Sequence, residues 1–441
     1  MAIPADSATA RALSERRVSF SDAYRYYIVA VIWLVLLFRF VDLQIIAVLL
    51  EPIRAEFKVS DTQLGILTGT AFALFYGVLG VPVAWLADRY SRRNLIAICL
   101  GLWSAMSALC GLATGFFSLL LARVGVGFGE AGGQPPSYSL ICDYFPPNRR
   151  STVFAILNTT LPLGVFVGFI IGGWINAHLG WRATLQAVGA AGIVAALLVR
   201  LTVREPARGA YDSPLSAPKA PPTAESLRYL WNLRSYRHLV LASSIFTLGA
   251  VGSGIWIASF FIRVHHMAAP QVAMWLAFIY GGGGLIGATL GGLLADRVSR
   301  RQQDRRWQAW IPAMSTAAIL PFSFFVYLWP NPITALLVHI GTTVLMYIWV
   351  GPSYATVQNL AGPSRRALAA AINLLVVNVI AIALGPLLIG AMSDYFKAQF
   401  AENSLRYSLL AVVALTYSWA ALHFLLAART LSQDLTAAET A

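Results

Sequence analysis

Long apolar blocks alternate with short polar breaks along almost the whole chain. Each block holds about 20 residues or more, the length that a helix needs to cross the hydrocarbon core of a bilayer. The pattern therefore predicts an all-α membrane protein with twelve transmembrane helices. Their expected ranges are 24–50, 63–87, 94–114, 117–143, 152–177, 183–203, 238–262, 270–295, 308–329, 332–358, 367–392 and 406–428.

A longer polar stretch divides these spans into two groups of six. Residues 204–237 are rich in proline, alanine and charge, and they contain no apolar run long enough to cross a membrane. We therefore expect a cytoplasmic linker, with a short helix near 224–233 lying on the membrane surface. The remaining boundaries predict a cytoplasmic N-terminal tail over 1–23, six-helix halves over 24–203 and 238–428, and a cytoplasmic C-terminal tail over 429–441.

The composition agrees with a membrane protein and argues against other classes. Hydrophobic residues make up 58% of the chain and charged residues 12%, about half the charge of a typical soluble domain. Because the chain shows no phosphate-binding loop, nucleophile–base arrangement or metal-ligand cluster, we expect no enzyme, no cofactor and no metal. The polar first 23 residues predict no cleavable signal peptide. We interpret Cys99, Cys110 and Cys142 as packing residues, since they lie in or beside apolar blocks without paired spacing.

The basic residues are distributed on one side of the predicted topology. The chain has 32 Lys and Arg and a net charge of +13, and most of these residues lie in the N-terminal tail, the even-numbered loops, the linker and the C-terminal tail. Basic residues collect on the cytoplasmic side of membrane proteins. We therefore expect a multi-pass protein of the cell (inner or plasma) membrane with both termini in the cytoplasm. The basic surplus then reflects orientation and affinity for anionic lipid headgroups, and nucleic-acid binding is not expected.

One charged phrase occurs twice. Residues 86–93 are "LADRYSRR" and residues 294–301 are "LADRVSRR", each at the end of the second span of its half. A second match, "PSY", lies at 136–138 and again at 352–354, and each copy is followed by an Arg-Arg pair. Two halves with the same features in the same order indicate a parallel duplication. Transporters that are built in this way bind their substrate near the membrane midplane, between the halves.

These repeated loops carry a resemblance to the major facilitator superfamily, which extends over essentially the whole chain. The stretches "AWLADRYSRRN" and "GGLLADRVSRRQ" are similar to the loop signature Gly-x-x-x-Asp-Arg-x-Gly-Arg-Arg of that family, with Ala84, Ser91 and Ser299 in place of glycines. The resemblance implies a transporter whose halves rock to give alternating access. We expect it to act as a monomer.

The repeated phrase also suggests a gate. An aspartate adds little to membrane orientation and is poorly placed at the C-terminus of its own helix, so its repetition favours a specific contact. We hypothesise a crossed clamp that closes the cytoplasmic face: Asp88 would meet the arginine pair that opens the eleventh span, and Asp296 the pair that opens the fifth. The alternative is that these are ordinary topology-setting charges on solvated loops. The expected gate residues are Asp88, Arg89, Arg92, Arg93, Asp296, Arg297, Arg149, Arg150, Arg365 and Arg366.

Two spans carry charges of both signs at depth. The first span holds Arg39 and Asp42, and the fourth holds Arg123 and Glu130. A charge at the bilayer centre costs at least ~2.5 kcal/mol and usually faces a cavity or a partner. With a rise of about 1.5 Å per residue, Asp42 and Arg123 lie at one level, and Arg39 and Glu130 lie deeper. We therefore expect these two pairs to meet in one cavity.

The four charges suggest proton coupling. A carboxylate that is desolvated in such a cavity holds a proton more readily, and a neighbouring arginine opposes this. Asp42 and Glu130 are the predicted proton-coupling residues, and spacing does not choose between them. Arg123 and Arg39 are the predicted switch or substrate-binding residues. The alternative is a pair of fixed ion pairs that lock the two spans together.

The fourth span resembles a narrower group, the spinster-type branch. That branch has an Arg, then Gly-x-Gly-Glu-Ala, then a Phe-x-x-x-x-Arg turn, and its first span has an Asp followed by Arg. This chain has Leu43 after Asp42, so the family gives no warrant for a role of Arg39. The matching positions in "GVGFGEAGGQPPSYSLICDYFPPNRRSTVFAI" and just before it are Arg123, Gly127, Gly129, Glu130, Ala131, Phe145 and Arg150.

The spinster-type resemblance implies transport of lysophospholipids or sphingosine-type lipids, driven by the proton gradient. A mostly apolar cavity wall with few charges suits such an amphiphile better than a sugar. The alternative is a proton-coupled symporter of small organic anions, because that branch has a similar Glu-Ala in the fourth span and a similar Phe-Pro turn. A sensor without transport activity is the third reading, but it predicts loss of the buried carboxylates.

Overall fold

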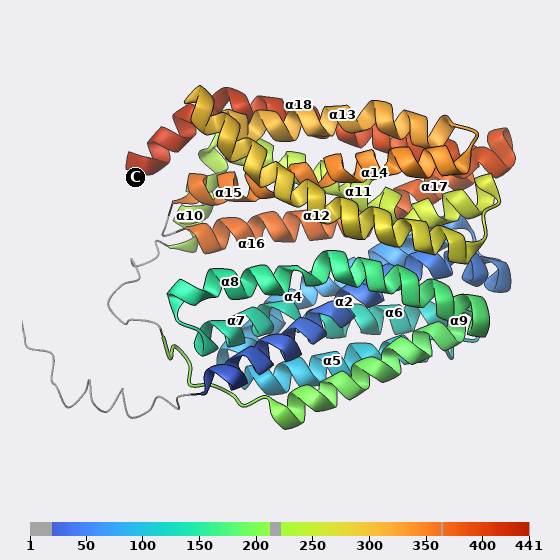
Figure 1. The fold of residues 1–441 in the computed structure, drawn as a ribbon, viewed down its shortest axis with the longest axis horizontal. Helices are drawn as coiled ribbons and strands as arrows, with labels where there is room; N and C mark the ends of the chain where they lie inside the picture. The colour runs from blue at the N-terminus through green and yellow to red at the C-terminus, as the bar shows by residue number, and fades with distance from the viewer. Residues whose placement is uncertain (1–19, 212–221, 363–364, 441) are drawn as a thin grey trace, which may run out of the picture.

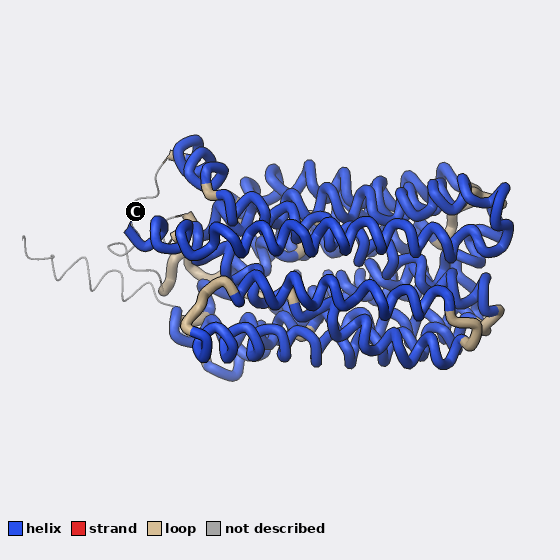
Figure 2. The backbone as a smooth tube through the Cα atoms, turned by 90° about the horizontal axis from the view of Figure 1, so that it is seen from above, coloured by secondary structure: helices blue, strands red, loops and turns tan. Residues whose placement is uncertain are grey.

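The computed structural model describes residues 20–211, 222–362 and 365–440. Its helices are aligned with one long axis. The N-terminal and C-terminal halves lie one above the other in Figure 1, and Figure 2 shows from above that the helices run along the long axis. The start of the first described helix, the short helix over 223–232 and the C-terminal end of the last helix lie at one end of the long axis in Figure 1, which we call the linker end. We call the other end the opposite end. Residues 1–19 of the predicted N-terminal tail, 212–221 of the predicted linker and residue 441 are outside the described residues.

The N-terminal half begins with a long helix whose first turn is capped by Ser21, which accepts a hydrogen bond from the Tyr24 amide at 3.3 Å. Gly180 has a φ of 81° and marks the turn between the fifth and sixth spans, a conformation that glycine adopts without strain. The elements of this half are α2 (Asp22–Phe57), α3 (Asp61–Gly65), η1 (Ile66–Thr70), α4 (Ala71–Arg89), α5 (Arg92–Cys110), α6 (Phe116–Glu130), α7 (Gln134–Tyr144), α8 (Pro147–Asn158) and α9 (Thr160–Thr202).

The C-terminal half follows a short helix of the linker. This helix, α10, packs through Ser226 and Leu230 and exposes Leu227 and Trp231 on its other face. The elements from here on are α10 (Thr223–Asn232), α11 (Arg234–His265), α12 (Ala269–Gln302), α13 (Trp307–Leu328), α14 (Pro332–Ile348), α15 (Val350–Ala361), α16 (Arg366–Val377), η2 (Asn378–Ile382), α17 (Ala383–Phe400), η3 (Ala401–Asn403) and α18 (Ser404–Thr440).

The described helices accommodate the twelve predicted spans. Nine helical stretches in the described ranges are long and apolar enough to cross a membrane. Two of them, Thr152–Thr202 and Ala371–Ala438, each contain two predicted spans. The fourth span is divided between α6 and α7 and is not among the nine. The predicted fold class, an all-α membrane protein with two six-helix halves, is confirmed.

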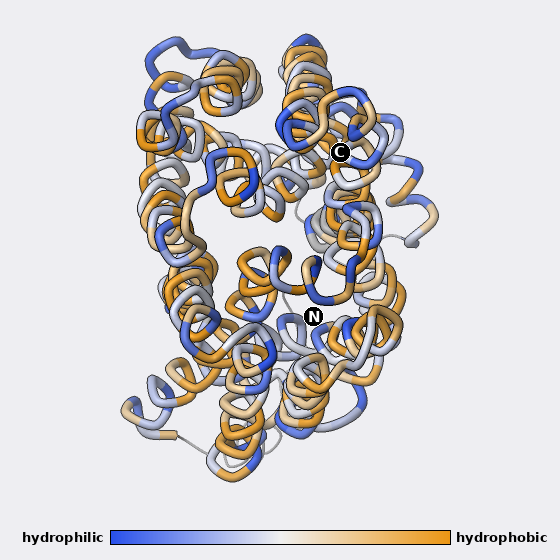
Figure 3. Tube along the Cα trace, turned by 90° about the vertical axis from the view of Figure 1, so that its right-hand side faces the viewer, coloured by the Kyte–Doolittle hydropathy of each residue, from blue (hydrophilic) through white to orange (hydrophobic). Residues whose placement is uncertain are grey.

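Large apolar side chains lie on the outer surface of the bundle. Phe117, Leu121 and Leu201 are each more than 70% exposed, which water would oppose and lipid tails would not. Viewed along the long axis in Figure 3, apolar colours follow the helices. The surface therefore fits a protein that crosses a bilayer along its long axis.

The two halves are joined by charged contacts at the opposite end. Arg263 of α11 donates to both carboxylate oxygens of Asp61 at 2.8 Å and to Glu51 of α2 at 2.7 Å. Asp394 of α17 accepts hydrogen bonds from the backbone amides of Asp61 and Thr62 at 3.2 and 2.8 Å. Because these contacts link α2 and α3 to α11 and α17, they hold the halves together at this end.

Candidate functional site

Asp42 and Arg123 form a buried ion pair between the first and fourth spans. The guanidinium of Arg123 donates to one carboxylate oxygen of Asp42 at 3.2 Å, and both residues are 1% exposed. Ser107 of α5 donates to the other carboxylate oxygen at 2.5 Å. Asp42 is therefore held by two hydrogen bonds, one from a guanidinium and one from a hydroxyl.

Arg39 and Glu130 form the second buried pair, in a different environment. The Arg39 Nε lies 3.3 Å from the Glu130 carboxylate, and Glu130 is completely buried. The remaining Arg39 nitrogens donate to Gln134 at 3.4 Å and to the Tyr76 hydroxyl at 3.3 Å. Among the described residues, neither oxygen of Glu130 has a hydrogen-bond partner of good geometry. Glu130 is therefore a buried carboxylate stabilised by charge proximity alone.

Close backbone packing positions these side chains. A Cβ on Gly127 of α6 would come within 2.6 Å of the Phe72 carbonyl oxygen, so the fourth span approaches the second closely only because this residue is glycine. A Cβ on Gly168 of α9 would lie 3.2 Å from the carbonyl oxygen of Val41, the residue before Asp42, so this approach is tight as well. The helical path of the fourth span is interrupted at residues 131–133, directly after Glu130. The site is thus set by rigid helices of the N-terminal half.

The predicted pairing of the four charges is the pairing that the structure contains. The expectation of one open cavity around all four charges stays a prediction. The space beside Asp42 is a small void, lined by Phe38, Trp103, Ser104, Ser107 and Val188 among others, and it has no room for a water molecule. Sequence reasoning missed Ser107, because a serine in an apolar span is usually satisfied by its own helix backbone. The one sign of the role of Ser107 is that its hydroxyl lies on the side of the third span that faces Asp42.

The first copy of the repeated phrase is held by the start of the linker. Arg92 is 3% exposed and pairs with Asp143 of α7 and, at 2.9 Å, with Glu205 of the linker. Glu205 also accepts hydrogen bonds from the Ser91 hydroxyl at 2.9 Å and the Arg93 amide at 2.8 Å. These contacts lie within the N-terminal half and the linker.

The ionisation of Glu205 follows from these contacts. Burial alone would raise the pKa of Glu205, but the hydrogen bonds from the Arg93 amide, Arg92 and Ser91 outweigh it and hold the pKa below its ordinary value. The carboxylate is therefore charged near neutral pH, and its hydrogen bonds stabilise the folded start of the linker.

The crossed clamp is not formed in this structure. Within the described residues, Asp88 makes no ion pair, and its backbone carbonyl accepts a hydrogen bond from Arg208 of the linker. Asp296 accepts a hydrogen bond from Gln308 at 3.3 Å, within its own half. Arg89 stacks on Trp85 at 3.9 Å, and Arg297 is exposed.

The arginine pairs of the expected clamp also have other partners. Arg149 pairs with Asp22 of α2 at 3.5 Å, and Arg150 donates to the carbonyl of Phe145 at 3.0 Å. Arg365 lies 3.9 Å from Glu225 of α10 and over the Tyr229 ring at 4.3 Å, while Arg366 is exposed. The gate residues of the two halves are thus separated in this conformation, and the halves are joined at the opposite end instead.

Metal binding has no support among the described residues, which contain no group of three or more His, Cys, Asp and Glu side chains arranged to hold an ion. The charged groups of the site are two buried carboxylates and two buried guanidinium groups.

Comparison with known proteins finds a matching family and several similar proteins. The family model described as Major Facilitator Superfamily matches residues 32–386. An "MFS-type efflux pump" of Mycolicibacterium smegmatis is 31% identical over 410 residues, which cover 92% of this chain and 93% of that protein. The sphingosine-1-phosphate transporter SPNS2 of Danio rerio is 27% identical over 385 residues, covering 83% of this chain and 76% of that protein.

A solved structure agrees with the fold. The crystal structure of a bacterial homolog to the human lysosomal transporter spinster, in an inward-facing and unoccupied conformation, matches with a TM-score of 0.87 and 30% sequence identity. The match covers 94% of this chain and 99% of that chain.

Proposed function

The chain belongs to the spinster-type branch of the major facilitator superfamily, and we propose that it is a proton-coupled secondary transporter of an amphiphilic, lipid-like substrate. The substrate class is a lysophospholipid or a sphingosine-type lipid. The energy source is the proton gradient, with no cofactor, and the functional unit is a monomer.

The observation that carries the proposal is the environment of Glu130. A buried carboxylate without hydrogen bonds is costly in its charged form, and Glu130 has only the Arg39 guanidinium at 3.3 Å to offset that cost. A small displacement of Arg39 therefore favours uptake of a proton by Glu130. Asp42 keeps two charge-assisted hydrogen bonds, so we assign Glu130 as the proton carrier in this conformation and Asp42 as the residue that fixes Arg123.

The distribution of basic residues supports an orientation of the protein in the membrane. We propose that the linker end faces the cytoplasm of a cell membrane, because the tails and the linker hold most of the basic residues. The halves are joined by Arg263 at the opposite end, and the gate residues are apart at the linker end. This arrangement supports an inward-facing state, in line with the conformation named for the similar crystal structure.

A second candidate function is symport of small organic anions, anchored by Arg39 and Arg123. Both arginines already have carboxylate partners in this structure. An anionic substrate would therefore have to displace Glu130 or Asp42, which makes this candidate the less favoured one.

Transport in liposomes separates the two candidates. The purified protein is reconstituted with a pH gradient, and the flux of a fluorescent lysolipid is compared with that of a small carboxylate. We expect gradient-driven lysolipid flux, its loss in Glu130→Gln, and a weaker or absent response to the gradient in Asp42→Asn.

Glu402→Gln is the matched control, because it removes an exposed carboxylate at the opposite end. It is expected to transport like the unmodified protein. Carboxylate flux without lysolipid flux would overturn the lipid assignment, and unchanged gradient dependence in Glu130→Gln would overturn the proton assignment.

A further inference from the structure

The linker helix α10 projects from the side of the bundle at the linker end. Figure 1 places it beside the start of α16, and in Figure 2 it is the short helix that stands out laterally from the others. Ser226 and Leu230 are buried, so one face of this helix is packed on the protein. A helix that projects sideways near one end of a membrane-crossing bundle lies at the level of the bilayer surface.

A second face of α10 is apolar and exposed. Leu227 is 44% exposed and Trp231 is 64% exposed, and the two side chains are neighbours on the helix, one turn apart. Ala224 extends the same face and is also exposed. Tryptophan is enriched at membrane–water interfaces, where its apolar ring and its polar N–H group are both satisfied. This face therefore fits the headgroup layer of a membrane better than it fits water.

The segment that carries this face is positively charged. Residues 223–238 contain three arginines and one glutamate. Arg228 follows Leu227 on α10, Arg234 lies just beyond the end of the helix, and both are exposed. An apolar face flanked by arginines is typical of helices that lie in the membrane interface, where basic side chains attract anionic lipid headgroups. The charge thus matches the anionic surface of a membrane.

A third face of α10 contacts Arg365, one of the predicted gate residues. The guanidinium of Arg365 lies over the Tyr229 ring at 4.3 Å and is 3.9 Å from the Glu225 carboxylate. At about 100° per residue, the exposed apolar face lies about 160° around the helix from these two contacts. The side of α10 that holds Arg365 and the side that is free to meet a membrane are therefore nearly opposite.

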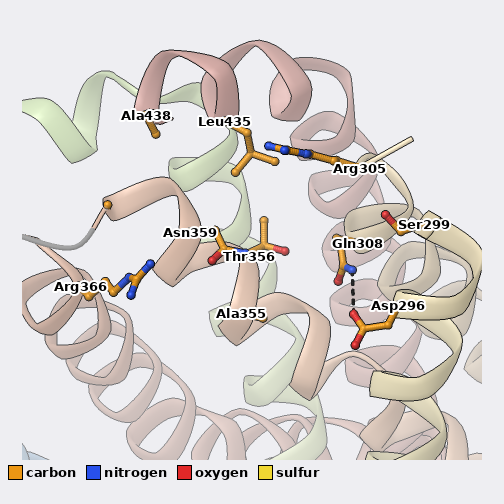
Figure 4. A pocket seen from close by; sticks show the side chains of 11 residues that line it. Asp296, Ser299, Arg305, Gln308, Ala355, Thr356, Asn359, Arg366, Leu435 and Ala438 are labelled. Atoms are coloured by element: carbon orange, nitrogen blue, oxygen red, sulfur yellow. Dashed lines mark hydrogen bonds between the residues drawn. The ribbon is translucent and has the colours of Figure 1, made fainter. Parts of the chain in front are cut away.

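The neighbouring arginine has a different environment. Arg366 lines a pocket within the C-terminal half, together with Asn359 and Asp296 (Figure 4). The contacts of Arg365, in contrast, are made with α10. Arg365 is thus the member of the pair whose position depends on where α10 lies.

We propose that α10 docks on the anionic headgroup layer of the membrane at the linker end. Leu227 and Trp231 enter this layer, and Arg228 and Arg234 contact the lipid phosphates. The docked helix holds Arg365 away from the crossed clamp. Because a ligand stabilises the conformation to which it binds better, anionic lipid favours the conformation in which the linker end is open.

Docking of α10 requires only that the bundle crosses a bilayer. The effect of docking on the linker end rests on the proposed transport function, because that end then acts as a gate. Spin-label measurements detect both without any substrate, and lysolipid flux is measured separately in liposomes. Failure of the docking is therefore distinguishable from failure of the transport function.

The accessibility of spin labels on α10 tests the docking. The full-length protein, with its three native cysteines replaced by alanine, is placed in nanodiscs of phosphatidylcholine with or without phosphatidylglycerol. Ala224→Cys carries a label on the apolar face, and Asn232→Cys carries one on another exposed side of the helix. We expect the label at 224 to collide with oxygen dissolved in the lipid and the label at 232 to collide with a water-soluble nickel complex.

A charge variant tests the recognition of anionic lipid. With phosphatidylglycerol present, Arg228→Gln should lower the ratio of protected to nickel-accessible label at 224 about fivefold, the factor that one basic side chain contributes near an anionic surface. Arg200→Gln is the matched control. It removes the same charge from an exposed position in the last turn of α9, away from α10.

The distance across the linker end tests the effect on the gate. Labels at Tyr90→Cys and Gln302→Cys are exposed on different halves, and we expect longer distances in nanodiscs that contain phosphatidylglycerol. Tyr229→Leu should remove this dependence but leave the label at 224 protected, because it deletes the ring under Arg365 and not the apolar face. Trp231→Ser should remove both the protection and the dependence.

Four results overturn the proposal. Equal access of the nickel complex to the labels at 224 and 232 would mean that α10 does not dock. Protection of the label at 224 from both oxygen and nickel would mean that protein covers this face. Equal effects of Arg228→Gln and Arg200→Gln would mean general charge attraction. A distance distribution that does not respond to phosphatidylglycerol would remove the effect of docking on the linker end.

Discussion

Glu130 and Asp42 show how two buried carboxylates at neighbouring levels come to have different surroundings. Asp42 accepts from Ser107 and Arg123, whereas Glu130 has a guanidinium nearby and no hydrogen bond of good geometry within the described residues. The cost of a buried charge depends on how many donors satisfy it. The difference between these residues is therefore a difference in their donors and not in their depth.

Ser107→Ala tests the role of the hydroxyl that holds Asp42. Loss of one hydrogen bond to a buried charged group is expected to cost about 1.5–3 kcal/mol of unfolding free energy. Unfolding of the purified protein by denaturant measures this cost. In the Asp42→Asn background the cost should shrink, because the charge that the hydroxyl satisfies is gone.

Ser104→Ala is the control for that experiment. Ser104 lies one turn earlier on the same helix and lines the same small void, and no hydrogen bond from it to Asp42 is found in the described structure. If the Ser104 and Ser107 variants lose equal stability, packing and not the hydrogen bond accounts for the effect.

At the residue scale the sequence was sufficient for the pairs and insufficient for their surroundings. Helical rise alone matched Asp42 with Arg123 and Arg39 with Glu130. Which neighbours donate to each carboxylate depends on how α5 packs against α2 and α6, and a serine in an apolar span gives no sign of this. The space beside Asp42 is also narrow, with Trp103 and Val188 in its wall.

At the scale of elements, the linker acts as a partner of the repeated phrase. Glu205 joins Ser91, Arg92 and Arg93 at the start of α5, and Arg208 donates to backbone carbonyls at the end of α4. The linker therefore caps the turn between the second and third spans. The charged phrase has a structural role in this conformation in addition to any role in a gate.

Glu205→Gln is expected to change the pH dependence of stability. The folded-state pKa of Glu205 lies below its ordinary value of 4.5, so its contribution is fully present above that value and is lost as pH falls through the lowered folded-state pKa. The contribution is on the order of 1 kcal/mol, since the side chain is partly exposed. Melting temperatures of both proteins between pH 7 and pH 3, roughly the range that spans the transition, measure it.

The difference between the two melting curves carries the result, because other carboxylates titrate in the same range in both proteins. We expect the unmodified protein to be more stable than the variant at neutral pH and the gap to close in acid. A gap that stays constant down to the lowest pH would mean that Glu205 does not contribute through its charge.

The break in the fourth span shows what local sequence can and cannot predict. The fourth span has prolines at 135 and 136, but the chain interrupts its helix just before them, at residues 131–133. A Cβ on Gly132 would overlap the Cys99 side chain, so tertiary packing decides where the helix breaks. The π-helical turns η1 and η2 were not predicted, because they arise where the second and eleventh spans cross.

At the scale of the whole molecule, the conformation could not be read from the sequence. A transporter sequence encodes at least two arrangements of its halves, and the crossed clamp describes one in which the linker end is closed. In this structure Asp88 and Arg365 have partners in the linker, and the halves are joined at the opposite end. The fold class followed from the repeat, and the state did not. The clamp stays a prediction for the other state.

Arg263→Gln is expected to open the opposite end. Arg263 joins Glu51 and Asp61 across the halves, and its loss weakens that closure by about 1.5–3 kcal/mol. Spin labels at positions 114 and 402, which are exposed on different halves, report the distance across this end. The distance distribution should shift to longer values.

Arg182→Gln is the matched control for that measurement, because Arg182 pairs with Glu56 within the N-terminal half at the same end. It should leave the distance distribution unchanged. Equal distributions for Arg263→Gln and the unmodified protein would remove the Arg263 contacts from the account of closure.

The central claim, that lipid movement is coupled to protons through Glu130, is tested most directly by recording proton movement itself. Liposomes that contain the protein and an internal pH-sensitive dye receive lysolipid without an imposed pH gradient. The account predicts a lysolipid-evoked pH change with the unmodified protein and with Glu402→Gln, and none with Glu130→Gln. Lysolipid transport with no accompanying pH change, or an undiminished pH change in Glu130→Gln, would contradict it.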